Sequence, residues 1–307
     1  MTNTLQRTAS SAQRAANRFK RMPLVVLCSL FALLSALPVW AEPAKVLLST
    51  TTLLPGESLR IEVDGLLPPV RIKALFMGKS YPFFVIGPNA NRALIGIKLD
   101  AKPGLYGLTF KALPYSQLPT DALPTEPFMI EIATKVFTTE NVNFAPEKTA
   151  LMKAEHRESI IIHQADAYLS RDQQWEGLFM YPVEGQVIGE FGLKRMRNGT
   201  IDAGFHKGID LRADRGTPAL AANSGTVVLA SHFKAHGNTV LINHGQGVMT
   251  IYLHLQSLSV SLRQKVHKGQ EIGKVGSTGL ATAPHVHFQV FVHGVPVDPK
   301  QWVDMEF

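Results

Sequence analysis

Cysteine is almost absent from this chain: Cys28 is the only one among 307 residues. It lies inside a predicted leader, residues 1–41, so we expect the mature chain to contain none. A thiol nucleophile, a Cys-ligated metal and a disulfide framework are therefore excluded for the mature protein. Any metal site must be built from histidine and carboxylate side chains.

The first 41 residues have the layout of a secretory leader. Four basic residues between Arg14 and Arg21 precede an uncharged, mostly apolar run, Leu24–Leu37, which is short for a membrane-spanning helix. We expect cleavage after Ala41. An uncleaved membrane anchor is the alternative, because the basic region is long. The sequence thus predicts an exported protein of the periplasm or cell envelope.

The mature chain also lacks a strong excess of charge. The leader holds five basic residues and no acidic ones, so of 31 basic and 24 acidic residues the mature chain keeps 26 and 24. The high isoelectric point is then mainly a property of the leader, and a nucleic-acid partner loses its main support. The Gly-rich segments do not contain the Gly-x4-Gly-Lys pattern of a phosphate loop, so nucleotide binding is not indicated.

Helix-period patterns are scarce, and short strand patterns dominate, which favours a predominantly all-β protein. Strand-like segments recur about every ten residues between Lys45 and Lys135, which predicts an Ig-like β-sandwich module over residues 42–138. Apolar residues at helical spacing after Pro146 predict a helical connector over residues 139–178. Strand patterns then return and predict an antiparallel β-domain over residues 179–307.

Two short motifs in this last domain carry pairs of potential metal ligands. His206 and Asp210 are four residues apart, so they share one face if their segment is a strand, and Gly208 between them leaves that face open. His285 and His287 are two apart on a predicted strand and also share a face. One carboxylate with imidazoles is a donor set suited to zinc.

His254 adds a further imidazole at the end of an apolar strand. A single histidine on a strand is more often structural than a ligand, but the combination with the two motifs is harder to attribute to chance. The remaining histidines of the domain lie in or beside turns, and we interpret them as structural or solvated: His232, His236, His244, His267 and His293.

The segment from Tyr181 to Trp302 resembles the lysostaphin/LytM family of zinc endopeptidases. The resemblance is carried by several motifs along the domain, and these motifs include Gly189-Glu190-Phe191-Gly192, His206-Lys207-Gly208-Ile209-Asp210, Gly216-Thr217-Pro218-Ala219, Gly237-Asn238-Thr239-Val240, Tyr252-Leu253-His254-Leu255, Gly276-Ser277-Thr278-Gly279, Pro284-His285-Val286-His287-Phe288 and Val297-Asp298-Pro299. Ala283 and Gln289 depart from the family pattern, where many members have Gly and Glu.

The resemblance implies a LytM-type antiparallel sheet (a duplicated hybrid motif) with one zinc ion per chain in a groove. Carried over residue by residue, His206, Asp210 and His287 would hold the zinc, and an open fourth position would admit water. His254 and His285 would be the unligated histidines of the site, and either could act as the general base.

The substrate that the family implies is the peptide part of peptidoglycan, and stem-peptide cross-links are favoured over glycine bridges. Two other interpretations compete with the endopeptidase. The first is a catalytically silent domain of the same fold that recruits or activates another cell-wall hydrolase. The second is a secreted adhesin, which would leave the histidine pattern unexplained. The N-terminal module could bind a cell-wall or envelope partner or cover the groove, and the oligomeric state is unknown.

Overall fold

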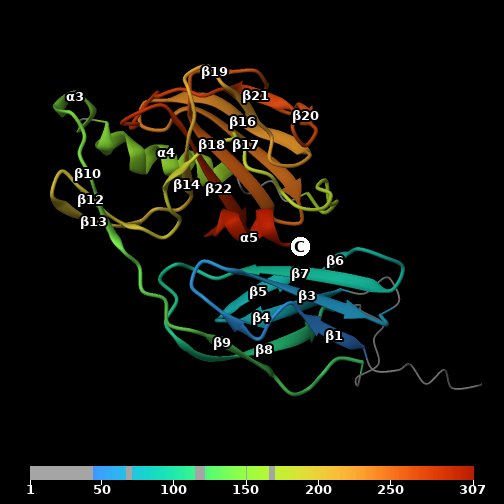
Figure 1. The fold of residues 1–307 in the computed structure, drawn as a ribbon. Coiled ribbons are helices and arrows are strands. Elements are labelled where there is room, and N and C mark those ends of the chain that lie inside the picture. The colour runs from blue at the N-terminus through green and yellow to red at the C-terminus, as the bar shows by residue number, and fades with distance from the viewer. Residues whose placement is uncertain (1–43, 67–70, 115–121, 150, 166–169) are drawn as a thin grey trace, which may run out of the picture. The chain divides into compact units, whose positions relative to one another are not determined.

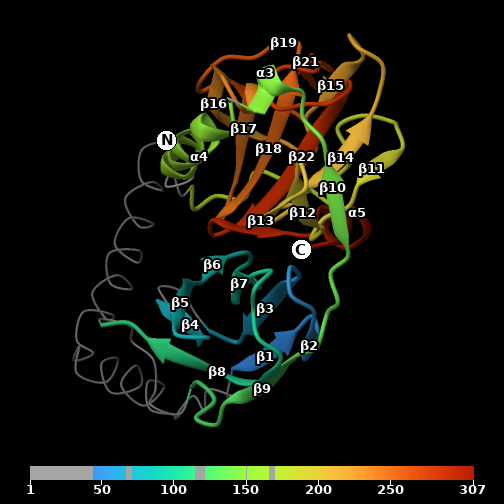
Figure 2. The same cartoon turned by 90° about the vertical axis from the view of Figure 1, so that its left-hand side faces the viewer.

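The computed structural model describes residues 44–66, 71–114, 122–149, 151–165 and 170–307, and the predicted cleavage site after Ala41 lies outside them. Residues Pro43–Phe307 form one compact unit. Strands make up most of its regular structure (Figures 1 and 2), so the predominantly β fold is confirmed. Within the described residues, no helix combines the length and the apolarity needed to cross a membrane.

The N-terminal strands form two sheets, with strand orders β1-β3-β7-β6 and β2-β9-β8-β4-β5. In β3, Leu59, Ile61 and Val63 are buried, while Arg60 and Glu62 between them are not. This period-two alternation buries one face of the strand against the other sheet. The Ig-like label for this module stays a prediction. The strands are β1 (Lys45–Leu48), β2 (Thr52–Leu53), β3 (Ser58–Asp64), β4 (Ile72–Phe76), β5 (Lys79–Pro82), β6 (Phe84–Val85), β7 (Ala90–Gly96), β8 (Gly104–Ala112) and β9 (Phe128–Ile132).

Polar side chains join these N-terminal strands to the end of the chain. Trp302, in helix α5 (Pro299–Asp304), donates from its indole Nε1 to the Ser58 hydroxyl at 3.0 Å. The buried Arg92 guanidinium donates to a main-chain carboxylate oxygen of Phe307 at 2.8 Å and to the Gln246 side-chain oxygen at 2.7 Å. These bonds satisfy groups that would otherwise be costly to bury.

The connector differs in part from the helical prediction. It begins with a strand, β10 (Thr139–Val142), which pairs in parallel with β12 (Lys194–Arg197). Two helices follow, α3 (Pro146–Thr149) and α4 (Met152–Ala165). A four-residue strand shows too little alternation to be recognised from its own sequence. The strand that pairs with it lies about 55 positions away.

The C-terminal domain is built on a sheet with the order β11-β14-β22-β18-β17-β16-β20, to which β23 adds through β22. All of its pairings are antiparallel, as predicted. A hairpin of β12 and β13 and a small sheet, β15-β21-β19, complete the domain. Its strands are β11 (Val187–Gly189), β13 (Thr200–Phe205), β14 (Ile209–Arg212), β15 (Pro218–Leu220), β16 (Gly225–Phe233), β17 (Gly237–Gly245), β18 (Val248–Leu255), β19 (Ser257–Leu258), β20 (Lys265–Val266), β21 (Glu271–Lys274), β22 (His285–Val292) and β23 (Val295–Val297).

The two faces of β22 contact different parts of the domain. Val286, Phe288 and Val290 are fully buried in the main core of the domain. The alternate residues point to the opposite face, where Phe291 joins a second apolar cluster with Ile251 and Leu253 of β18. His285 and His287 lie on that second face, as their spacing predicts. The core face therefore fixes the strand, and the other face is left for the site.

His244 lies in a buried chain of hydrogen bonds at the far side of the same sheet. Its Nδ1 donates to the Ser224 carbonyl oxygen at 2.7 Å, and its Nε2 accepts from the Thr250 hydroxyl at 2.8 Å. Thr250 in turn lies 2.9 Å from the Tyr252 hydroxyl. Burial lowers the pKa of His244 to about 4. The ring is thus neutral and structural, as interpreted from the sequence.

We expect His244 to make the protein less stable in mild acid. The unfolded chain binds a proton near pH 6.5 and the folded chain only near pH 4, so this stability is complete above pH 6.5 and is lost as the pH falls through that window. The loss should reach about 1.4 kcal/mol per pH unit. Urea unfolding at pH 7.5 and pH 5.5 should show a smaller pH difference for His244→Gln than for wild type.

His267 provides the control, because it is exposed in the folded chain whereas His244 is buried. His267→Gln makes the same substitution at an exposed position and controls for the loss of an imidazole as such. Comparing each variant with wild type cancels the contributions of the other titrating groups. An equal pH difference in wild type and His244→Gln would contradict the assignment.

Candidate metal centre and groove

His206, Asp210 and His287 converge on one point. His206 Nε2 lies 3.1 Å from Asp210 Oδ1 and 3.0 Å from His287 Nδ1, and His287 Nδ1 lies 2.6 Å from the same carboxylate oxygen. All three residues are buried. Among the described residues, these three form a group that could hold a metal ion. One potential ligand atom from each residue lies within 4.8 Å of the other two.

Two strands and one loop bring these residues together. Asp210 of β14 and His287 of β22 are direct partners in the antiparallel register, so their side chains share a face. His206 lies just after β13, separated from β14 by Lys207 and Gly208. The segment 206–210 is therefore not one continuous strand, and the loop, not strand alternation, turns His206 toward Asp210.

In each of the three side chains, the polar atom that points away from the cluster contacts another group. His206 Nδ1 donates to the Glu190 carbonyl oxygen at 2.7 Å, and Arg195 donates to Asp210 Oδ2 at 2.6 Å. The Gln289 amide lies 2.6 Å from His287 Nε2. These contacts leave His206 Nε2, Asp210 Oδ1 and His287 Nδ1 as the inward-facing atoms. Outer partners of this kind orient the ligands of a metal.

The donor set fits zinc. Two imidazole nitrogens and one carboxylate oxygen are the ligands of a three-residue zinc site that keeps a further coordination position open. Burial lowers the pKa of His287 to about 4, so this ring is neutral at physiological pH. Burial would raise the pKa of Asp210, but the His287 and His206 rings outweigh it and hold that pKa well below its ordinary value. A neutral His287 ring beside an ionised Asp210 carboxylate gives two of the protonation states that metal binding requires.

His254 and His285 lie beside the three potential ligands with one nitrogen fixed and the other available. Their Nδ1 atoms donate to the carbonyl oxygens of Thr278 at 2.9 Å and of Ala283 at 2.8 Å. The two ring centres are 5.0 Å apart, and the centre of the His254 ring is 6.2 Å from that of His287. Burial lowers the pKa of His254 well below its ordinary value.

The backbone of His254 is strained. Its φ angle is +65°, in the left-handed region that residues other than glycine seldom adopt. A hydrogen bond from its N–H to the His236 carbonyl oxygen, at 3.0 Å, holds this conformation. Strain of this kind is concentrated at functional sites.

Gly208 is required where β14 approaches β22. A Cβ atom there would lie 2.3 Å from the Phe288 carbonyl oxygen and 3.0 Å from His287 Nε2. We expect Gly208→Ala to displace β22, to destabilise the fold by about 1–3 kcal/mol and to weaken metal binding. Urea unfolding and zinc titration would measure both effects.

Gly87 is the matched control, since a Cβ there would come no closer than 3.5 Å to the Ala90 Cβ. Gly87→Ala should leave zinc affinity unchanged and alter stability little. Wild-type zinc affinity in Gly208→Ala would show that the close approach does not position His287.

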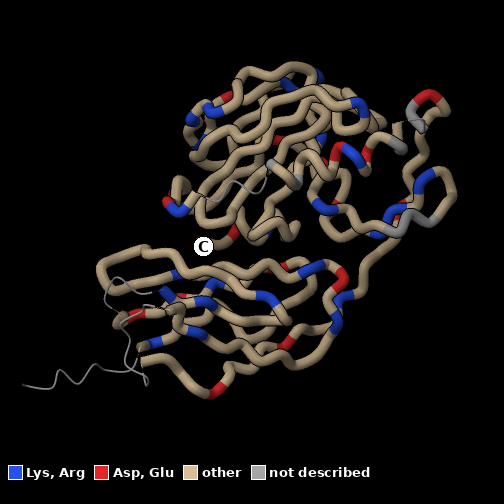
Figure 3. Tube along the Cα trace, turned by 180° about the vertical axis from the view of Figure 1, so that it is seen from behind, with Lys and Arg blue, Asp and Glu red and all other residues tan. Residues whose placement is uncertain are grey.

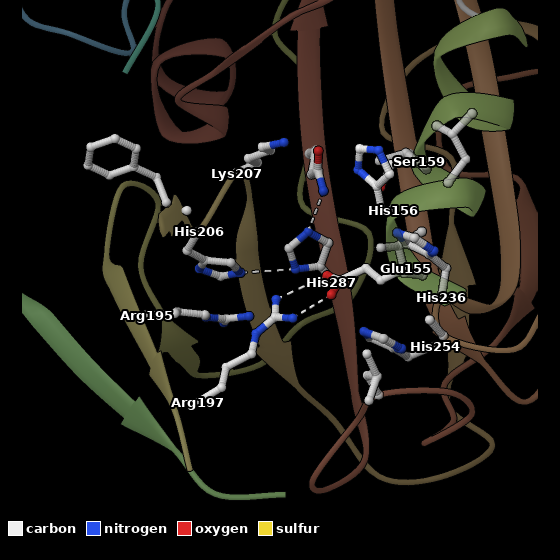
Figure 4. A pocket seen from close by; sticks show the side chains of 18 of the residues that line it. Glu155, His156, Ser159, Arg195, Arg197, His206, Lys207, His236, His254 and His287 are labelled. Carbon is white, nitrogen blue, oxygen red and sulfur yellow. Dashed lines mark hydrogen bonds and ion pairs between the residues drawn. The ribbon is translucent and has the colours of Figure 1, made fainter. Parts of the chain in front are cut away.

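A groove extends from the metal centre to helix α4 (Figure 4), and several of its residues were not predicted from the sequence. Arg195 and Arg197 come from β12, which sequence analysis did not identify. His236 was interpreted as structural or solvated, but it lines the groove and its Nδ1 lies 2.8 Å from Glu158 Oε2. Sequence motifs identify residue types suited to binding a metal, whereas these neighbours are brought to the groove only by the folded arrangement.

The model of peptidase family M23 matches residues 204–299, which include His206, Asp210, His254, His285 and His287. Peptidoglycan DD-endopeptidase ShyA of Vibrio cholerae is 36% identical over 141 residues, which cover 45% of this chain and 33% of ShyA. Cell division protein DipM of Caulobacter vibrioides is 37% identical over 131 residues, or 40% of this chain and 20% of DipM. The chain thus spans a third or less of the length of these relatives.

A crystal structure assigned to peptidase M23 from Pseudomonas aeruginosa extends the similarity to most of the chain. It aligns with a TM-score of 0.60 at 28% identity and covers 81% of this chain and 94% of its own. The aligned region is therefore larger than the family match and reaches beyond the C-terminal domain.

Proposed function

Because the C-terminal domain of this chain is a peptidase M23 domain of the LytM/lysostaphin type, we propose that the protein is a zinc-dependent endopeptidase that hydrolyses peptide bonds in peptidoglycan. The observation that carries the proposal is the convergence of His206, Asp210 and His287, whose inward atoms lie within 3.1 Å of one another. We favour stem-peptide cross-links over glycine bridges, since the similar ShyA is a DD-endopeptidase.

A zinc ion held by these three residues would supply an activated water and polarise the scissile carbonyl group. The surrounding residues prepare the site for that ion. Arg195 neutralises the outer oxygen of Asp210, and the Glu190 carbonyl oxygen fixes the tautomer of His206. Burial of all three ligands excludes bulk water and strengthens the local electrostatic interactions.

His254 and His285 would move the proton. Their Nδ1 hydrogens are committed to carbonyl oxygens, so each ring presents Nε2 as an acceptor. A neutral imidazole in this position can take a proton from the attacking water and deliver it to the leaving amine. The lowered pKa of His254 keeps that ring in the accepting form at neutral pH.

The leader and the N-terminal module extend the proposal to the location of the protein. An exported enzyme, cleaved after Ala41, would meet its substrate in the periplasm or cell envelope. The N-terminal module would then be placed to bind a cell-wall or envelope partner, and its bonds to Trp302 and Phe307 tie it to the catalytic domain.

The test uses residues 42–307, which contain the whole compact unit. We expect about one zinc per chain and release of soluble peptide from purified cell walls with direct stem-peptide cross-links. Chelation should stop the release and added zinc should restore it. Walls with glycine bridges should release less. Zinc binding without release from either wall would reject hydrolysis and favour the silent domain that recruits another hydrolase.

A further inference from the structure

The charged side chains that line the groove are mostly basic. Arg195, Arg197 and Lys207 face it together with several histidines, and Glu155 of α4 is the acidic residue among the described lining residues. Arg195 is engaged by Asp210 at the metal centre. Arg197 lies farther along β12, where the groove is closed by α4.

Glu155 and Arg197 form a two-pronged ion pair across the groove. Arg197 Nη2 donates to Glu155 Oε1 at 3.0 Å, and Nη1 donates to Oε2. Figure 4 shows the two bonds of the pair as dashed lines, and both residues line the same pocket as His287. Burial would raise the pKa of Glu155, but the bond to Arg197 outweighs it and lowers that pKa, so the carboxylate is ionised.

Helix α4 does not depend on this pair for its position. Glu158 accepts hydrogen bonds from the backbone N–H groups of Lys234, Ala235 and His236 at 2.9, 3.0 and 3.1 Å. Ile162 is buried in the apolar cluster that contains Ile251 of the sheet. The described charged residues of α4, Glu155, Arg157 and Glu158, all lie in its first half (Figure 3). Glu158 and Ile162 therefore hold the helix, and Glu155 contacts the groove arginine Arg197.

We propose that Arg197 anchors a carboxylate group of an anionic peptide substrate, and that Glu155 occupies Arg197 until the substrate displaces it. The inference rests on the proposed function, whose substrate carries free carboxylates along its stem peptide. A guanidinium group presents two parallel N–H donors that match any carboxylate, so substrate can replace Glu155 without a change in the geometry of Arg197. The helix remains in place because Glu158 and Ile162 hold it.

Binding of soluble peptide tests this exchange without requiring turnover. The probes are an uncross-linked stem tetrapeptide with free carboxylates and the same peptide with its carboxylates amidated. Isothermal titration calorimetry with residues 42–307 would compare wild type with Glu155→Gln, Arg197→Gln and Arg197→Lys. Glu147→Gln makes the same charge change at an exposed position of α3 and serves as the control.

Removing the competing charge should strengthen binding of the free-carboxylate peptide. We expect Glu155→Gln to bind it about tenfold more tightly than wild type, with no gain for the amidated peptide. Arg197→Gln should bind both peptides equally weakly, and Arg197→Lys should recover part of the preference because it keeps the charge but not the fork. Glu147→Gln should behave as wild type.

Equal affinity of wild type and Glu155→Gln for the free-carboxylate peptide would overturn the proposal. So would a preserved preference for that peptide in Arg197→Gln, once urea unfolding shows that the variant is folded. The result is independent of catalysis: a chain that shows the predicted binding but releases no peptide from walls would refute the hydrolase and leave the carboxylate anchor standing.

Discussion

Replacing His206 by alanine should leave the protein without stoichiometric zinc and without measurable release of wall peptides. The imidazole contributes one of three inward-facing ligand atoms, and its outer nitrogen is already committed to the Glu190 carbonyl oxygen. Loss of an outer partner of a ligand typically costs about 10–100-fold in metal affinity, so loss of the ligand itself should cost at least about 100-fold. Zinc content after gel filtration and peptide release from walls would measure both losses.

His267→Ala is the control for this variant, since it removes an imidazole from an exposed position outside the groove. It should keep one zinc per chain and wild-type release. Near-ultraviolet circular dichroism would verify that His206→Ala is folded. Full release of peptide by a folded His206→Ala protein would show that the cluster of His206, Asp210 and His287 is not the catalytic centre.

Local sequence patterns were sufficient for the sheet that carries the site. In β22 the alternation of His285, Val286, His287 and Phe288 predicts which side chains face the core, and burial of Val286 and Phe288 in the main core agrees. Period-two alternation works here because the strand packs one face against a large apolar core and leaves His285 and His287 on the other face. The pairing of Asp210 with His287 then follows from the antiparallel register.

The walls of the groove could not be predicted in this way. The β12–β13 hairpin is short and polar, and in β12 the residues Lys194 to Arg197 show no apolar alternation. It is held by its pairing with β10 and by the bond from Arg195 to Asp210, and Arg197 contacts Glu155 of α4. Arg195 is thus a positioning residue that only the folded structure reveals.

The packing of the connector could not be predicted from local patterns either. Its helical spacing indicates α4, but the spacing does not tell which surface the helix covers. The position of the helix is fixed by Glu158, whose carboxylate accepts hydrogen bonds from the three backbone N–H groups of residues 234–236. The sequence of that turn does not indicate that a helix packs there. Burying this carboxylate without donors would cost free energy, so the three N–H groups favour this one position of the helix.

His254→Ala and His285→Ala should separate proton transfer from metal binding. Neither residue belongs to the three inward-facing ligands, so both variants should retain about one zinc per chain. Loss of the general base should lower peptide release by about 10²–10⁴-fold, whereas loss of a histidine that only assists should cost less. Parallel zinc analysis and initial rates of release would distinguish them.

We expect the larger loss in His254→Ala. The strained φ of +65° and the hydrogen bonds to His236 and Thr278 hold its ring in one orientation, with a pKa that keeps Nε2 unprotonated. His285, in contrast, is not among the described residues that line the groove, and its Nε2 lies 3.7 Å from Asp210 Oδ1. This arrangement suits His254 to accepting the proton and leaves His285 an assisting role. A greater loss in His285→Ala, with zinc retained, would reverse the two roles.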